Sequence, residues 1–309
     1  MPKYRFNLDE MVFPDGRKKG VKPEDKNPQK ARMKVADRCD PVKGQIEIIP
    51  QKFWEEYRIL KHHQAREDRF RFTLDQNSIG SCAAESAAAV KGSLDTKQNF
   101  DMVLYNPWFI YQTTSGGRDN GSVIGDNMEF LRDRGCAPEE VWPRSKGWKA
   151  EPGAEVKRIA KFFTVENFYH VETIEELVSA LLQGFDIHGG YSGHAVCFMQ
   201  LKAGRKVKFK NSWGDWGVNG FGELSLDKVY FPYGCYAATN ARWWQPEEWS
   251  PRNDQKQLDL ATTVYMNAIN EIALGKDKLA KLVKSDARSA DDYRGDLYAD
   301  IMAQYGLSV

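Results

Sequence analysis

At 309 residues, with 41% hydrophobic and 28% charged side chains, the chain has enough apolar material for a large folded body, which excludes a wholly disordered protein. Its 44 basic and 43 acidic side chains nearly cancel, so the net charge of +1 gives no general attraction to nucleic acid or to an anionic membrane. The five cysteines are too few and too scattered for a disulfide framework, and none has the spacing of zinc ligands. We therefore expect no metal and no cofactor.

The chain begins MPKYRFNLDEMVF, and the charges scattered through this stretch do not fit the apolar centre of a secretory signal. No later stretch has the run of apolar residues that a transmembrane helix requires. Together with the cysteine usage, these features predict a cytoplasmic protein in a reducing compartment, without membrane contact.

Residues 1–50 are rich in Lys, Arg, Asp, Pro and Gly and show no sustained period, which predicts an extended arm. Glu24 and Asp25 interrupt its lysines, and no aromatic side chains alternate with them. We therefore expect a solvated or protein-bound segment and no nucleic-acid contact. Residues 51–65 are predicted to form a helix that packs on the main body, because four apolar side chains share one helical face. These are Phe53, Trp54, Tyr57 and Leu60.

The segment CAAESAAAVKGSL, which begins at Cys82, combines strong helix formers with an apolar stripe. Gly80 and Ser81, which precede it, suit a turn and an N-cap. We therefore predict that Cys82 lies at the N-terminus of a helix.

Two further helices are predicted farther along the chain. Residues 125–134 contain an apolar cluster, and Gly135 ends it. In TIEELVSALLQG, Thr173 is the predicted N-cap and Glu176 stands at the capping-box position.

Between residues 188 and 226 the pattern shortens to three strand-like pieces, GHAVCFMQL, KVKFKNSW and GFGELSL. In KVKFK the lysines alternate with Val and Phe, which predicts a half-buried strand whose lysines face solvent. Helical periods return from Leu258 onward. We expect the apolar stripes of these C-terminal helices to pack on the helical part of the protein or on a protein partner.

A cysteine thiol becomes a good nucleophile as thiolate, which needs a nearby positive charge or a helix N-terminus. Cys82 has the predicted helix N-terminus. A histidine beside it would supply the charge, and a side-chain amide that accepts from the other ring nitrogen would orient the imidazole. His194 and Asn211 are the candidates, while His170 and His188 are alternative bases in principle.

Three segments, QNSIGSCAA, GHAVCFMQL and FKNSWGDWGVNGFGEL, together resemble the active-site segments of papain-like cysteine peptidases. GCAPEEVWP, from Gly135, is similar to a structural stretch of bacterial and viral members. The resemblance covers residues 69–244. It implies Cys82 as nucleophile, His194 as base and Asn211 as the orienting residue. It also implies that Gln76 donates to the oxyanion hole together with the backbone N–H of Cys82.

By the same resemblance, Trp213 covers the histidine–asparagine pair and lines the leaving-group side of the cleft. Gly121 and Ser122 fall where the family binds the substrate backbone. The chain departs from the family pattern at Ala83, which replaces an aromatic residue, and at Asp215, which alone separates two Trp-Gly pairs. These departures keep a silent homologue among the alternatives.

The resemblance implies an α+β, papain-like fold in which a helical half and a β-barrel-like half flank a cleft. We expect an N-terminal arm and helix at 1–68, a catalytic domain at 69–247 and a helical C-terminal extension at 248–309. The arm or the C-terminal helices are candidate contacts for a protein partner.

The predicted function is cysteine-type endopeptidase activity on a protein or peptide substrate, through a Cys82 thioester. One alternative is a catalytically silent or self-blocked homologue that serves as a structural or interaction component. Another is amidase, deubiquitinase-like or acyl-transfer chemistry on the same residues.

Overall fold

The computed structural model describes residues 20–24, 30, 36, 38–60, 67–70, 72–98 and 103–242. The chain divides into two compact units, Met1–Gln245 and Pro246–Val309, and the second lies wholly outside the described residues. The helices predicted from Leu258 onward therefore lie outside the description. So do residues 61–65 of the helix predicted at 51–65.

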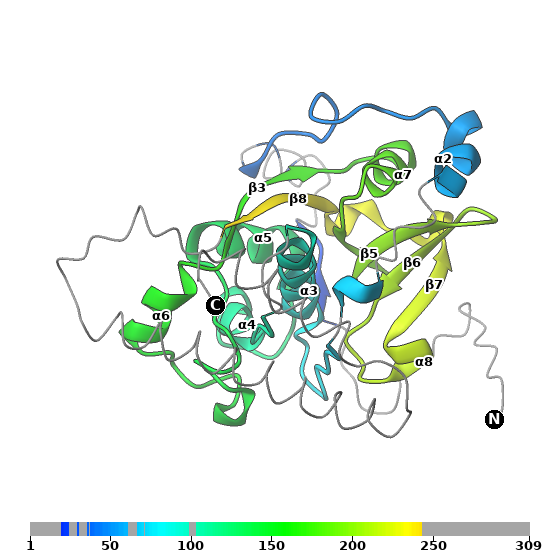
Figure 1. The fold of residues 1–309 in the computed structure, drawn as a ribbon. Coiled ribbons are helices and arrows are strands. Elements are labelled where there is room, and N and C mark those ends of the chain that lie inside the picture. Colours follow the sequence, from blue (N-terminus) through cyan, green and yellow to red (C-terminus); the bar gives the residue numbers. More distant parts are fainter. Residues whose placement is uncertain are drawn as a thin grey trace, which may run out of the picture. The chain divides into compact units, whose positions relative to one another are not determined.

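Six strands of the first unit form one sheet in the order β3-β8-β4-β5-β6-β7 (Figure 1). Each neighbouring pair is antiparallel. The strands are β3 (Thr164–His170), β4 (Ile187–Tyr191), β5 (His194–Lys202), β6 (Lys206–Lys210), β7 (Phe221–Ser225) and β8 (Tyr236–Arg242). Two short strands, β1 (Val21–Lys22) and β2 (Ser122–Val123), pair in parallel in a separate sheet.

The described α-helices are α2 (Trp54–Leu60), α3 (Cys82–Lys97), α4 (Trp108–Thr114), α5 (Ile124–Arg134), α6 (Ala154–Ala160), α7 (Ile174–Leu182) and α8 (Trp216–Asn219). Short 3-10 turns are η2 (Gln51–Phe53), η3 (Glu67–Arg69), η4 (Arg144–Lys146), η5 (Leu226–Lys228) and η6 (Phe231–Tyr233). None of these described helices has the length and apolarity needed to cross a lipid bilayer.

Strand β5 separates two hydrophobic cores. Ala195, Cys197 and Met199 belong to a core that they share with α3, α4 and α5. The residues between them, Val196 and Phe198, belong to a second core shared with α7 and β6. Because side chains alternate across a strand, burial on both faces requires a continuous apolar run, which GHAVCFMQL supplies.

Several local predictions are confirmed. Helix α5 ends before Gly135, whose φ of 76° is easily adopted by glycine. Helix α7 begins with the predicted cap, since Thr173 Oγ1 accepts from the N–H of Glu176 at 3.2 Å. The Glu176 carboxylate accepts from the N–H of Glu172, one residue before the cap.

Three details of these predictions are wrong. Lys210 does not face solvent: it is 3% exposed, and its ammonium donates to the carbonyl of Asn219 at 2.9 Å. Ser81 stands at the N-cap position of α3, but its side chain makes no capping bond. In the helix predicted at 51–65, Trp54 is buried, whereas Phe53 and Leu60 are 39% and 61% exposed.

Part of the predicted arm is built into the body. Val42 and Ile49 are 0% and 2% exposed and lie in the second core. The N–H of Val42 donates to the carbonyl of His170 at the end of β3, and the N–H of Ile49 donates to Ser179 Oγ in α7. Residues 38–60 thus pack on the sheet and on α7.

Candidate active site

Cys82 is the first residue of α3 and is fully buried. Its Sγ accepts a hydrogen bond from the N–H of Ala195 at 3.5 Å. Ala195 directly follows His194, so the start of α3 meets the start of β5. A thiol at a helix N-terminus experiences the partial positive charge of the helix dipole, as the sequence predicts.

A two-residue turn places His194. Ser192 and Gly193, which join β4 to β5, have φ values of 46° and 82°, as in the tight turns that suit the twist of a hairpin. His194 Nε2 lies 2.7 Å from Asn211 Oδ1. Asn211 Oδ1 also accepts from the N–H of Ser212, which identifies this atom as the amide oxygen. Nε2 therefore carries the proton, and Nδ1 is the basic nitrogen of the neutral ring.

Trp213 covers this pair. Its ring stacks on the His194 imidazole with centroids 4.4 Å apart and an interplanar angle of 29°. Trp213 is only 3% exposed. The indole therefore shields the imidazole from water, which strengthens the hydrogen bond to Asn211.

Gln76 joins the loop before Cys82 to the loop after β6. Its backbone N–H donates to the carbonyl of Ser212 at 2.9 Å. Its Oε1 accepts from Ser212 Oγ at 2.9 Å and from Trp213 Nε1 at 3.2 Å. Because two donors hold Oε1, the Nε2 group points the other way and donates to the carbonyl of Ile79 at 2.8 Å. Gln76 is thus held in one orientation close to the start of α3.

The chain itself lies against the thiol. A Cβ added to Gly20 would stand 2.2 Å from the carbonyl oxygen of Gly80 and 2.8 Å from Cys82 Sγ, so any side chain here would clash. The Gly20 carbonyl accepts from the N–H of Ser122 at 2.9 Å. Gly121 also lies against Gly20, because a Cβ added to Gly121 would lie 2.3 Å from the Gly20 carbonyl oxygen. Gly121 and Ser122 therefore contact the chain's own backbone.

Three hydrogen bonds connect the residues on the two sides of Gly20. The Tyr111 hydroxyl accepts from the N–H of Gly121 at 3.1 Å and donates to Asp119 Oδ1 at 3.0 Å. Asp119 Oδ1 in turn accepts from the N–H of Gly80 at 2.8 Å. At the next residue along the chain, the N–H of Val21 donates to the carbonyl of Gly193, which directly precedes His194.

Burial raises the pKa of the Cys82 thiol to about 11. The backbone N–H groups of Ala195, Gly20 and Ala83 act in the opposite direction, because they stabilise the thiolate. Desolvation is the larger effect, so the pKa of the thiol stays above its ordinary value.

A similar fold is found in a known structure. The chain is similar to xylellain, a cysteine protease from Xylella fastidiosa, with a TM-score of 0.53 and 17% identity, over 75% of this chain and 100% of that one. The fold is papain-like. At this identity the similarity establishes the fold alone.

Other similar structures have TM-scores below 0.5. Cwp84, a surface-layer-associated cysteine protease of Clostridium difficile, has a TM-score of 0.49 and 14% identity, over 56% of this chain and 50% of that one. Procathepsin L 3 of Tenebrio molitor has a TM-score of 0.47 and 14% identity, over 70% and 80%. No protein-family model matches the sequence. No curated protein matches it either.

Within the papain-like fold, residues 20–24 form what we call the N-terminal segment, and Glu24 anchors it. Glu24 is 5% exposed. Its Oε1 accepts from the Tyr236 hydroxyl at 2.6 Å and from the N–H of Gly125, in the first turn of α5, at 3.2 Å. Its Oε2 accepts from Arg38 at 2.9 Å. Burial raises the pKa of Glu24, and the Arg38 charge opposes that rise.

The alternative histidines are occupied elsewhere. His188 Nδ1 lies 2.7 Å from Ser86 Oγ, and full burial lowers the pKa of His188 to about 3. His170 lies 3.4 Å from a Glu172 carboxylate oxygen. Neither contact involves Cys82 or Asn211. Among the described residues, no three His, Cys, Asp or Glu side chains are grouped as metal ligands would be.

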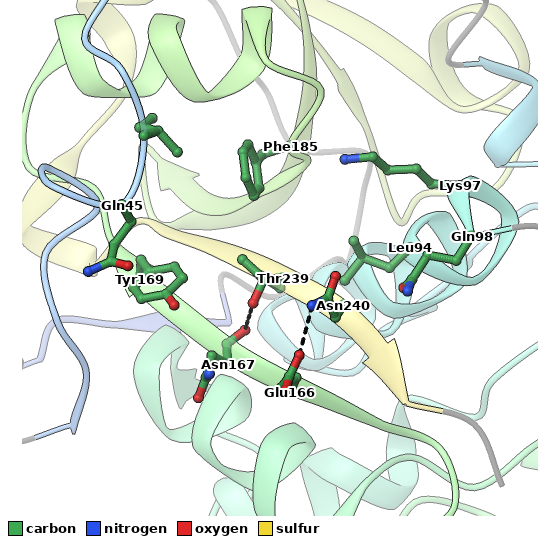
Figure 2. A pocket seen from close by; sticks show the side chains of 12 residues that line it. Gln45, Leu94, Lys97, Gln98, Glu166, Asn167, Tyr169, Phe185, Thr239 and Asn240 are labelled. Carbon is green, nitrogen blue, oxygen red and sulfur yellow. Dashed lines mark hydrogen bonds between the residues drawn. The ribbon is translucent and has the colours of Figure 1, made fainter. Parts of the chain in front are cut away.

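A cavity of about 380 Å³ lies away from Cys82, between the C-terminal end of α3 and the strands β3 and β8 (Figure 2). Lys97 and Gln98 enter it from α3, and Phe185 faces them. Asn240 donates to Glu166 across the paired strands. None of the sequence-predicted site residues lines it.

Two groups at the site were not predicted from the sequence. Gly20 is one of several glycines in a basic stretch, and no local pattern distinguishes it. Glu85 and Arg144 form an ion pair at 3.2 Å beside α3, although 59 residues separate them. A lone glutamate in the alanine-rich run after Cys82 is the signal that could have indicated a buried partner, because an unpaired buried carboxylate is costly.

Proposed function

We propose that this chain is a cysteine endopeptidase in which Cys82, His194 and Asn211 carry the chemistry. One observation supports this most strongly: the Cys82 thiol meets the backbone beside His194, and His194 Nε2 bonds Asn211 Oδ1 at 2.7 Å. This is the order of nucleophile, base and orienting amide that thioester chemistry requires. The papain-like fold supports a peptidase, and the activity itself is our proposal.

In the proposed reaction the Cys82 thiol first gives its proton to Nδ1 of His194, and the thiolate then attacks the carbonyl carbon of a peptide bond. The N–H of Cys82 and Nε2 of Gln76 donate to the oxyanion that forms. Protonated His194 then gives its Nδ1 proton to the leaving amine, and the peptide C–N bond breaks. In the second half, Nδ1 takes a proton from water, the resulting hydroxide attacks the thioester, and the acid is released with the thiol restored.

A second candidate is a self-blocked homologue, and the position of Gly20 supports it. The N-terminal segment fills the space in front of the thiol and uses the Ser122 N–H that a substrate would need. The Gly20 carbonyl accepts from that N–H at 2.9 Å, so the segment is held by the group that would hold a substrate. We infer a latent peptidase, which becomes active when the segment leaves.

The test is labelling of Cys82 by an electrophilic peptide probe under reducing conditions. Full-length protein is compared with Cys82→Ala, Gly20→Ala and the control Gly153→Ala, where an added Cβ meets nothing within 4 Å. We expect Gly20→Ala to react at least about tenfold faster than the unmutated protein, because its methyl group expels the segment. Gly153→Ala should match the unmutated protein, and Cys82→Ala should not react.

Three outcomes separate the candidates. Labelling of Gly20→Ala together with cleavage of casein supports the latent peptidase. Labelling without cleavage of casein favours a silent homologue. Absence of labelling in both the unmutated protein and Gly20→Ala contradicts the proposed function.

A further inference from the structure

The guanidinium of Arg144 connects the two ends of the loop that carries Gln76. Arg144 begins η4, far from α3 in sequence. Its Nη1 donates to the carbonyl of Asp75 at 2.9 Å, directly before Gln76. Its Nη2 donates to the carboxylate of Glu85 at 3.2 Å, one helical turn after Cys82. The intervening residues have no regular structure until α3 begins.

Other contacts hold the guanidinium in place. Arg144 Nε lies 3.5 Å from Glu139 Oε2, and Glu139 Oε1 accepts from the backbone N–H of Arg144 at 2.6 Å. The guanidinium carbon lies 5.8 Å from the ring centroid of Trp108. The planar guanidinium has five donors in a rigid fork, so it can bond Asp75 and Glu85 in one fixed geometry.

Stability alone is a poor explanation for this pair. Glu85 is fully buried, and burial raises its pKa to about 7 against the opposing charge of Arg144. The cost of desolvating a buried ion pair commonly cancels its attraction. Such a pair is more readily explained by the geometry that it enforces, and here it ties α3 to the start of the Gln76 loop.

We propose that Arg144 is a positioning residue that sets the distance between the side-chain amide of Gln76 and the backbone N–H of Cys82. This inference rests on the proposed function, in which those two groups donate to the oxyanion. Gln76 lies in a loop and Cys82 at the start of a helix. Arg144 bonds to Asp75 in that loop and to Glu85 in that helix. Without it, Gln76 keeps its bonds to Ser212, Trp213 and Ile79, but the direct tie between Asp75 and Glu85 of α3 is lost.

Trp213 provides a reporter that does not depend on catalysis. Its indole N–H donates to Gln76 Oε1 at 3.2 Å, so its ¹H–¹⁵N resonance responds to a displacement of Gln76. The resonance is assigned with Trp213→Phe. The reactivity of Cys82 with iodoacetamide is a second reporter, because that displacement forms no oxyanion and needs only the thiolate.

The experiment compares Arg144→Met and Arg144→Lys with the control Arg158→Met, which removes an exposed pair with Glu155 on α6. All are made in full-length protein carrying Gly20→Ala. For Arg144→Met we expect a shifted Trp213 resonance and a fall in kcat on fluorescent casein of about tenfold to a hundredfold. KM and the iodoacetamide rate should stay within about twofold. Arg144→Lys keeps the charge and should recover part of the loss, and it replaces Arg144→Met if that variant does not fold.

The proposal is overturned by an unchanged Trp213 resonance, by an unchanged kcat, or by an equal fall in kcat and iodoacetamide rate. A shift of the same size in Arg158→Met also overturns it. If the Gly20→Ala protein cleaves nothing, the proposed function fails instead. The Trp213 resonance then still decides whether Arg144 holds Gln76.

Discussion

The proposed base His194, its partner Asn211 and the oxyanion donor Gln76 are all oriented by residues of the loop after β6. Ser212 donates to both Asn211 Oδ1 and Gln76 Oε1, and its carbonyl accepts from the Gln76 backbone. Trp213 stacks on His194 and donates to Gln76. Ser212 and Trp213 thus orient the imidazole and the oxyanion donor together. A change in this loop should therefore affect both proton transfer by His194 and stabilisation of the oxyanion by Gln76.

Asn211→Ala tests the orienting role. The substitution removes the acceptor for His194 Nε2, so the imidazole loses its fixed tautomer and direction. In the Gly20→Ala background we expect kcat on casein to fall at least about tenfold, with KM within about twofold. Gln112→Ala, which removes an exposed amide paired with Glu151, is the control. A kcat that stays unchanged in Asn211→Ala would contradict the role.

At the level of elements, the path of the N-terminal segment depends on glycines, whose lack of a side chain lets the backbones approach closely. Gly20 passes between Gly80 and Gly121, and β1 pairs with β2 over two residues on each strand. So short a pairing contributes little by itself. Glu24, which bonds the first turn of α5, therefore supplies much of the attachment.

The pKa of Glu24 gives this attachment a defined pH dependence. Because the docked pKa is raised, docking is favoured at acid pH and weakens as pH rises through that pKa. We expect the rate of Cys82 labelling, divided by the rate for Glu24→Gln, to increase as pH rises from about 4.5, the ordinary value for Glu. The ratio cancels the change in thiolate fraction, which both proteins share. A ratio that is constant with pH, or that rises toward acid pH, would refute the inferred sign.

At the scale of the whole molecule, residues 38–60 belong to the folded body. Ile49 is 2% exposed and packs in the second core, whereas Ile59 on α2 is 59% exposed. A truncation meant to free the thiol should therefore stop before residue 38. Removal of residues 1–50 would also remove Val42 and Ile49 from the core.

The two isoleucines make a matched pair. Ile49→Ala should lower the free energy of unfolding by about 2–5 kcal/mol, because it leaves a cavity in a packed core. Ile59→Ala should change it by less than about 0.5 kcal/mol. Chemical denaturation of the full-length variants measures both. Equal effects would place residues 38–60 outside the core.

The sequence by itself determined the features that depend on neighbours along the chain. These include the helix start at Cys82, the cap of α7, the strands β5 to β7 and, through the family resemblance, the fold. Capping, helix propensity and side-chain alternation are local, so a short stretch of sequence carries them.

Only the tertiary structure decided which distant residues meet. It buried Lys210 beside the Asn219 carbonyl, paired Glu85 with Arg144 and placed Gly20 against Cys82. These contacts join residues that no local period relates, and their energies come from desolvation and close packing, which depend on what the rest of the chain places around them.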